Sequence, residues 1–275
     1  MLEGKFINAL LLTLFAGLAT GVGGAIILFF KKFSSKMLSA SLGFSAGVMI
    51  FISFVELFRE ARTSLGNAFG DHIGLIYTLL AFFGGMALIA IIDNVIPEDN
   101  NPHEVSPMTK SVHEEAVGER SIELGGKHLL RLGFFSALVI AIHNFPEGMA
   151  TFMSAMTDTT LGVSIAFAIA IHNIPEGIAI AVPIYYATRK KGKAVLNATL
   201  SGLAEPIGGV VGYILLRNFL SPVVLGIVLA IVAGIMVYIS LDELLPNAEN
   251  YGEHHIAIMG VIAGMAFMGF GLTLF

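Results

Sequence analysis

Apolar residues form eight long blocks along the chain, and polar residues gather between them. The blocks cover approximately residues 6–30, 37–57, 74–95, 130–155, 161–187, 194–216, 222–243 and 256–275. Each block is close to the roughly 17–25 residues that a helix needs to cross a bilayer. The first block is too long for a signal peptide and follows both Glu3 and Lys5, so we expect a retained helix. The pattern predicts an all-α polytopic membrane protein with eight transmembrane helices, in one domain that spans residues 1–275.

Composition supports a membrane protein and excludes several other classes. Hydrophobic residues make up 56% of the chain and charged residues only 13%, whereas soluble domains carry about 25% charged residues. The chain has no cysteine, which excludes disulfides and thiolate metal sites. No basic stripe interleaves with aromatic residues, so nucleic acid is not an expected partner.

Lysine and arginine fall mostly on one side of this topology. If both termini lie outside, four basic residues are external: Lys5, Arg59, Arg62 and Arg217. The other eleven then lie in inner connections: Lys31, Lys32, Lys36, Lys110, Arg120, Lys127, Arg131, Arg189, Lys190, Lys191 and Lys193. Because basic loops stay in the cytoplasm, we expect the plasma (inner) membrane, with both termini outside the cytoplasm. The polar, acid-rich connection at about 96–128 is then cytoplasmic. We interpret it as a linker rather than as a weak metal-collecting segment built on His103, His113 and His128.

Two segments far apart in the chain resemble each other. Residues 46–57 read AGVMIFISFVEL and residues 233–244 read AGIMVYISLDEL, with seven of twelve positions identical. The expected topology runs the first segment outward and the second inward. Matched segments of opposite direction indicate an inverted repeat, a common construction of transporters. We therefore expect helices 1–3 to mirror helices 6–8 around a central pair, helices 4 and 5.

A polar hexapeptide occurs twice inside apolar blocks, as HNFPEG at 143–148 and HNIPEG at 172–177. Residues four apart lie on the same face of a helix, so His143 and Glu147 can point at one ion, with Asn144 beside them. The second copy repeats the arrangement with His172, Asn173 and Glu176. Polar groups inside a membrane are costly and usually mark a pathway. Two antiparallel helices with these faces opposed would surround a small volume near the middle of the membrane.

Each motif also contains a proline and a glycine. Pro146 and Pro175 lack the N–H that a helix would use at those positions. Gly148 and Gly177 allow a neighbouring helix to come close.

The sixth block adds a third intramembrane glutamate, Glu205, again followed by a proline. Three carboxylates cannot all stay ionised in hydrocarbon, because burial disfavours the charged form. A divalent cation would compensate them, and protons would compete with that cation for an empty site.

The donor types indicate which ions and which route to expect. Imidazole with carboxylate and no thiolate suits zinc first, and also Fe²⁺, Mn²⁺, Co²⁺ and Cd²⁺. Acidic groups at a pore mouth concentrate cations. We expect Glu56 and Glu60 at the outer mouth. The inner mouth would hold Asp93, Asp242 and Glu243.

With these motifs in this order, the chain resembles the ZIP (Zrt/Irt-like) family of divalent metal transporters, and within it the bacterial zinc-uptake branch. The resemblance covers essentially the whole chain. It implies movement of metal into the cytoplasm by alternating access. Many members carry an acidic residue or a second histidine where this chain has Asn173, so the second site is less anionic here.

The resemblance also implies a two-metal centre. One site would use His143, Glu147, His172 and Glu176. The other would use Asn144, Asn173 and Glu205 and share Glu147 and Glu176 as bridges. Glu243 and Asp93 match positions that the family associates with release inside.

Two other functions use the same ligands. An intramembrane metalloenzyme would need a general base, and HExxH is absent, so we expect no enzyme activity. A channel-like pore stays open as an alternative. The expected partners are divalent metal ions and the lipid bilayer, with a homodimer as one oligomeric state to consider; no cofactor is expected beyond the bound or transported ion.

Overall fold

Helices make up nearly all of the structure, a computed structural model that describes residues 2–29, 35–95, 140–142, 144–219, 221–251 and 254–274. No strand occurs among these residues. Seven helices are long and apolar enough to cross a membrane: Glu3–Leu28, Lys36–Phe69, Asp71–Ile92, Thr159–Val182, Lys191–Leu216, Pro222–Asn250 and His254–Gly271. They confirm seven of the eight expected blocks. In the remaining block, residues 140–142 and 144–157 are helical, while 130–139 and His143 lie outside the described residues.

The described helices follow one another along the chain. In order they are α1 (Leu2–Ala25), α2 (Ser35–Ile52), α3 (Arg59–Phe69), α4 (Asp71–Val95), the helix at 144–157, α7 (Thr159–Thr188), α8 (Lys191–Gly202), α9 (Ala204–Leu216), α10 (Pro222–Ile239), α11 (Leu245–Tyr251) and α12 (His254–Gly271). Local chemistry sets several starts. The Asp158 carboxylate accepts the Thr160 and Leu161 N–H groups at 2.7 and 3.1 Å and caps α7.

Three expected spans differ in detail from the structure. The second continues past residue 57 through α3, and the seventh continues through α11. The sixth is divided at Leu203 between α8 and α9. Pro206 has no N–H to donate to the carbonyl of Gly202, four residues earlier, which accounts for the interruption.

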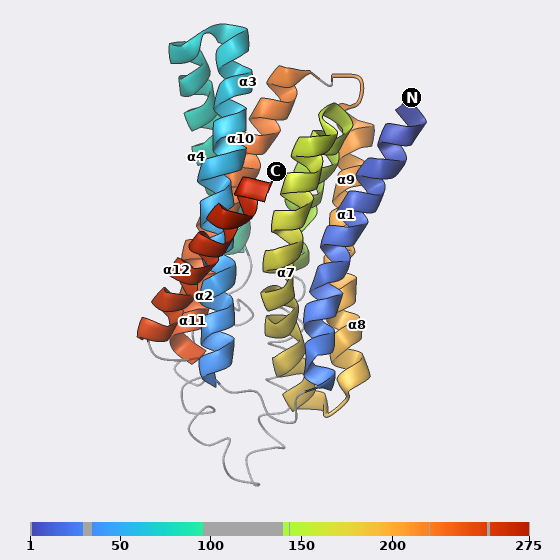
Figure 1. Ribbon diagram of the computed structural model, residues 1–275, viewed down its shortest axis with the longest axis vertical. Helices are drawn as coiled ribbons and strands as arrows, with labels where there is room; N and C mark the ends of the chain where they lie inside the picture. Colours follow the sequence, from blue (N-terminus) through green and yellow to red (C-terminus); the bar gives the residue numbers. More distant parts are fainter. Residues whose placement is uncertain are drawn as a thin grey trace.

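The helices form two groups (Figure 1). In one group α1 packs on α7, α8 and α9, and α7 also packs on α8. In the other, α2 packs on α12 and α11, while α10 packs on α3 and α4. The groups meet where α2 contacts α7. Both ends of the chain point toward the upper end of the view in Figure 1.

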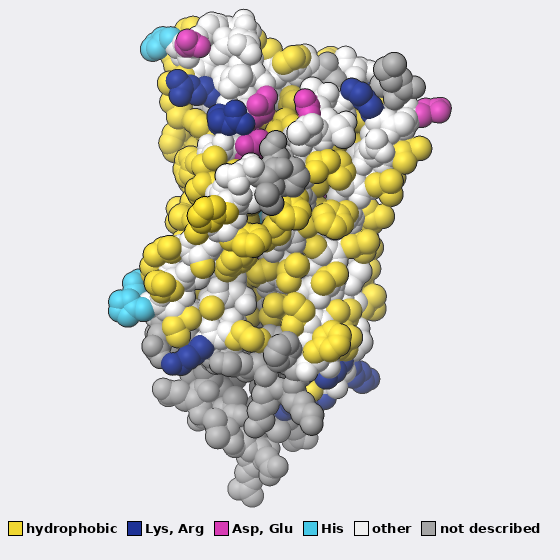
Figure 2. Space-filling model, viewed as in Figure 1, with side chains coloured by type: hydrophobic (Ala, Val, Ile, Leu, Met, Phe, Trp, Pro, Cys, Tyr) yellow, Lys and Arg dark blue, Asp and Glu magenta, His cyan; other side chains and the backbone are white. Residues whose placement is uncertain are grey.

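The surface has the distribution expected of a bilayer-spanning bundle. Figure 2 shows apolar side chains over the middle of this face, with charged side chains toward its two ends. Large apolar side chains such as Leu80, Phe83 and Phe270 are exposed. Exposed apolar side chains on this scale are unfavourable in water and favourable against lipid.

The two similar segments share a local distortion that hydropathy does not reveal. Each helix changes to a π-helix, at Ser53–Phe58 after α2 and at Ser240–Leu244 after α10. The first serine of each π-helix donates to the carbonyl four residues earlier, Ser53 to Met49 at 2.6 Å and Ser240 to Met236 at 2.7 Å. The distortion therefore begins at the same position of both twelve-residue segments.

Their helix contacts match as well. A Cβ at Gly47 of α2 would lie 2.1 Å from the Val261 carbonyl oxygen of α12. A Cβ at Gly234 of α10 would lie 2.0 Å from the Phe82 carbonyl oxygen of α4. Glycine is required at both positions because a backbone atom blocks any side chain. The pair α2 and α12 thus packs as α10 and α4 do.

Candidate metal site

The first motif reaches the site on the helix at 144–157, which packs closely on α9. A Cβ at Gly148 would lie 1.9 Å from the carbonyl oxygen of Glu205, so the glycine allows the close helix contact that the sequence predicts. This contact brings Glu205 beside the helix that carries Asn144 and Glu147. Both of those side chains are fully buried.

The second motif lies on α7, which continues as an α-helix through Pro175. His172, Asn173 and Glu176 are all fully buried. The Ser45 hydroxyl of α2 donates to the His172 carbonyl oxygen at 3.2 Å, which links α2 to α7 at the level of the motif. Gly177 again permits close packing, because a Cβ there would lie 1.9 Å from the carbonyl oxygen of Thr20 in α1.

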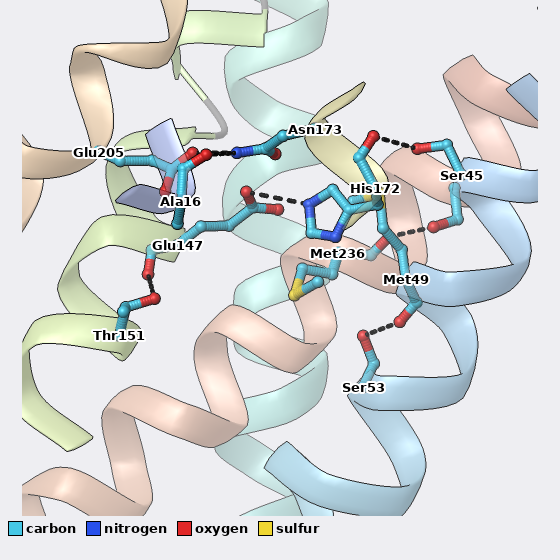
Figure 3. Close-up of polar contacts among 11 residues, drawn as sticks. Ala16, Ser45, Met49, Ser53, Glu147, Thr151, His172, Asn173, Glu205 and Met236 are labelled. Atoms are coloured by element: carbon cyan, nitrogen blue, oxygen red, sulfur yellow. Dashed lines mark hydrogen bonds and ion pairs between the residues drawn. The ribbon is translucent and has the colours of Figure 1, made fainter. Parts of the chain in front are cut away.

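The two motifs and Glu205 meet in one place (Figure 3). His172 Nε2 lies 3.4 Å from Glu147 Oε2, which joins the second motif to the first. Asn173 Nδ2 donates to Glu205 Oε1 and, at 2.9 Å, to the Ala16 carbonyl oxygen. The Glu205 carboxylate is also within electrostatic reach of Glu147 and Glu176. Side chains from three helices and a main-chain carbonyl of a fourth therefore form one cluster.

Several buried polar atoms in this cluster have no hydrogen-bond partner among the described residues. They are Asn144 Nδ2 and Oδ1, Glu147 Oε1, Asn173 Oδ1 and Glu205 Oε2. Buried polar atoms are nearly always paired with protein, water or an ion. Four of these five atoms are oxygens, the donors that hard and borderline divalent cations accept.

Charge in the cluster is also one-sided. Three glutamates are fully buried, whereas every lysine and arginine in the described ranges is exposed or half-buried. A bound cation would compensate these carboxylates, and protons would do so in an empty site. Across the parts of the chain that the structure describes, no three His, Asp or Glu side chains already form a metal cage; His143, which the sequence assigns to the site, lies outside those parts.

Three of the five expected mouth residues lie in the two π-helices, and the other two lie in α3 and α4. Glu56 belongs to the first π-helix and pairs with Arg59 at 3.3 Å. Glu60, one turn on, accepts from the Ser64 hydroxyl at 3.4 Å. Asp242 and Glu243 lie in the second π-helix, half-buried and buried respectively. Asp93 is in α4, but its side chain is outside the described residues, as is the whole connection at 96–128.

Several features in and around the cluster could not be recognised from the sequence. Thr20, Ser45 and Ala16 belong to unremarkable apolar stretches of α1 and α2, and Ala16 acts only through its carbonyl oxygen. The two π-helices were not foreseen either, and the serine at the same position of both similar segments was their single sequence signal.

Comparison with known proteins identifies the family. A model of the family "ZIP Zinc transporter" matches residues 4–271. This chain belongs to the ZIP zinc transporter family. The ZIP chain is 57% identical over 267 residues to a protein of Chlorobium chlorochromatii named "Zinc transporter ZupT", with 97% of each chain covered. It is 54% identical over 272 residues to a protein of the same name from Clostridium perfringens, covering 97% of this chain and 95% of the relative.

Membership confirms part of what the sequence predicts. The ZIP chain is a multi-pass membrane protein of a transporter family and not an enzyme. The metalloenzyme alternative is thereby removed. The expected bacterial branch of the family is also confirmed, because relatives named "Zinc transporter ZupT" match over nearly their full length.

Proposed function

We propose that this chain moves zinc and related divalent cations, among them Fe²⁺, Mn²⁺, Co²⁺ and Cd²⁺, across the membrane into the cytoplasm. The observation that carries the proposal is the fully buried cluster of Glu147, His172, Asn173, Glu176 and Glu205, in a part of the chain where no described lysine or arginine is buried. A divalent cation supplies the compensating charge. Both relatives are named zinc transporters, which supports the same cargo.

The cluster divides into two halves that suit two ions. Glu147 and His172, already in contact, would hold one ion with His143 and Glu176. Asn144, Asn173 and Glu205 would hold the other, with Glu147 and Glu176 as bridges. The support is that the Asn173 oxygen and one oxygen of Glu205 are buried and have no partner among the described residues. The hydrogen bond from Asn173 Nδ2 to Ala16 fixes the amide so that its oxygen is the atom presented.

The route would run between the two groups of helices. Matched π-helices and matched glycine contacts support an inverted repeat, in which helices 1–3 mirror helices 6–8 around the central pair, in an eight-helix chain. The two groups meet at α2 and α7, beside the site. Relative movement of the groups would expose the site first to one side and then to the other.

The π-helices would form the two mouths. Glu56 and Glu243 occupy the same position of the two similar segments, so one acid would serve the outer mouth and its counterpart the inner mouth. Glu60, Asp242 and Asp93 would add negative charge and raise the local cation concentration. With both termini outside, as the distribution of basic residues indicates, transport through these mouths delivers metal to the cytoplasm.

Uptake by the purified chain in proteoliposomes tests the proposal. External zinc is supplied as a radioactive isotope, and the isotope retained inside the vesicles is counted with and without preloaded unlabelled zinc. We expect saturable uptake, stimulated when zinc is preloaded, and at least ten-fold slower uptake in Glu147→Gln. Glu3→Gln, at an exposed position near the start of α1, is the matched control and should retain the wild-type rate.

Two results would contradict the proposal. Equal rates in wild type and Glu147→Gln, with equal amounts of folded protein, would remove the carboxylate site from the route. Uptake without stimulation by preloaded zinc would favour a channel-like pore over a carrier.

A further inference from the structure

Thr20 of α1 lies at the position that corresponds to Glu205 of α9. The backbone carbonyl of Glu205 is the atom that Gly148 approaches at 1.9 Å, measured from a Cβ built on the glycine. The backbone carbonyl of Thr20 is the atom that Gly177 approaches at the same distance. Gly148 and Gly177 are the last residues of the two hexapeptide motifs. The helix that carries each motif therefore packs against the backbone of one of these two residues, Glu205 or Thr20.

The correspondence continues one turn further along each helix. A Cβ at Gly208 of α9 would lie 2.1 Å from the Phe145 carbonyl oxygen. A Cβ at Gly23 of α1 would lie 2.0 Å from the Ile174 carbonyl oxygen. Phe145 and Ile174 are the third residues of the two motifs, and each glycine follows its partner, Glu205 or Thr20, by three residues. Helices α1 and α9 thus contact the two motifs in the same way.

The side chains at these matched positions have different partners. Asn173 of one motif donates to Glu205. In the other half of the site, Asn144 corresponds to Asn173 and Thr20 corresponds to Glu205. Asn144 and Thr20 are both fully buried. Thr20 Oγ1, Asn144 Nδ2 and Asn144 Oδ1 have no hydrogen-bond partner among the described residues. The half of the site that faces α1 therefore repeats the half that faces α9, with a neutral hydroxyl in place of the carboxylate.

The presence of a threonine rather than a carboxylate at position 20 determines the net charge of the cluster when two ions are bound. Glu147, Glu176 and Glu205 provide three negative charges when ionised, whereas two divalent cations carry four positive charges. A carboxylate at position 20 would balance them, and threonine leaves the doubly loaded site with an excess positive charge. In a buried site this excess disfavours the second ion, because charge is screened weakly there.

We infer that Thr20 is an affinity-determining residue of the transport site, which keeps the second ion weakly bound and so permits its release. This inference rests on the proposed function, because it presumes that the cluster binds metal. A carboxylate at position 20 should hold the second ion at least ten-fold more tightly, or about 1.4 kcal/mol. Tighter binding should also slow release and lower kcat for uptake.

Zinc binding to the purified full chain in detergent tests the inference. Equilibrium dialysis against buffered free zinc gives the number of ions bound and the Kd of each. We expect the Kd of the second ion to fall at least ten-fold in Thr20→Glu, with a lower KM and a lower kcat for uptake in proteoliposomes. Thr20→Asp has a shorter side chain and replaces Thr20→Glu if the longer residue prevents folding. Thr20→Gln has the shape of glutamate without its charge and should not tighten the second ion.

Exchanging the two side chains gives a second, independent test. Glu205→Thr should lose the second ion, and Thr20→Glu combined with Glu205→Thr should recover it, because the carboxylate returns at the matched position. Thr13→Val, at a buried threonine two turns earlier in α1, controls for substitution in this helix and should bind zinc as wild type does.

The possible results distinguish a failure of this inference from a failure of the proposed function. If wild type binds zinc but Thr20→Glu leaves the Kd of the second ion within two-fold, or the exchanged variant behaves as Glu205→Thr does, the inference is wrong and the transport site stands. If wild type binds no zinc and Glu147→Gln transports normally, the proposed function itself fails.

Discussion

Gly148 offers a direct test of how closely the site depends on helix packing. In Gly148→Ala the new Cβ would lie 1.9 Å from the Glu205 carbonyl oxygen and 2.5 Å from its carbonyl carbon. Both are backbone atoms and cannot rotate away. Ordinary contact begins near 3.4 Å, so the helix at 144–157 and α9 must separate by about 1.5 Å. Metal–ligand distances tolerate only about 0.2 Å.

We therefore expect Gly148→Ala to lower zinc uptake at least ten-fold and to destabilise the fold by about 1–3 kcal/mol, as overpacking of a tight core does. Uptake is measured in proteoliposomes, and stability by size-exclusion chromatography after heating. Gly84→Ala is the matched control, since Gly84 lies in α4 with no atom within 4 Å of its built Cβ. It should leave both properties unchanged. Wild-type uptake and stability in Gly148→Ala would refute the close contact and the site geometry built on it.

Three further predictions concern the ligands and the local structure. Glu176→Ala should abolish uptake while the protein still reaches the membrane, because it removes a carboxylate that we propose as a bridge between the two ions; uptake assays with surface labelling check this, and a wild-type rate would argue against the bridge. Zinc at 100 times its Kd should stabilise wild type against heat by about 2.7 kcal/mol through mass action, and Glu147→Gln should lose most of that gain; equal stabilisation in both would show that zinc binds elsewhere. Asp158→Ala removes the cap of α7 and should cost about 0.5–2 kcal/mol in stability with little change in KM for zinc, so a large rise in KM would instead connect this cap to the site.

Much of the architecture could be predicted because lipid imposes a simple rule on sequence. A crossing helix must satisfy its own backbone and present apolar side chains, so its length and position appear directly as hydropathy. Seven crossing helices appear in the structure where the pattern predicts them. The polar exceptions were equally visible, since a glutamate within an apolar block, such as Glu147 or Glu176, is costly and usually marks a functional site. Because two copies of one hexapeptide carry these residues, their gathering in one buried cluster could be predicted without any coordinates.

Helix ends and distortions were less predictable. The continuation of the second span through α3 and the π-helix at Ser53–Phe58 depend on contacts with neighbouring helices, such as α10. Apolar composition is the same in an α-helix and in a π-helix. A serine whose hydroxyl donates to the carbonyl four residues earlier is compatible with both kinds of helix, so it does not predict the π-helix.

The amino-acid sequence alone determined that this protein crosses the membrane many times and that carboxylates, imidazoles and carboxamides occur at matching positions of two apolar blocks. These properties depend on composition and on spacing within one helix, where residues four apart share a face whatever surrounds them. Only the tertiary structure decided that Asn173 bonds Glu205 and Ala16, and that Thr20 stands where Glu205 stands in the matched contact. Such pairings join residues that are distant in the chain, and they depend on which glycines let which backbones touch. The periodicity of residues along a single helix does not show which distant residues pair.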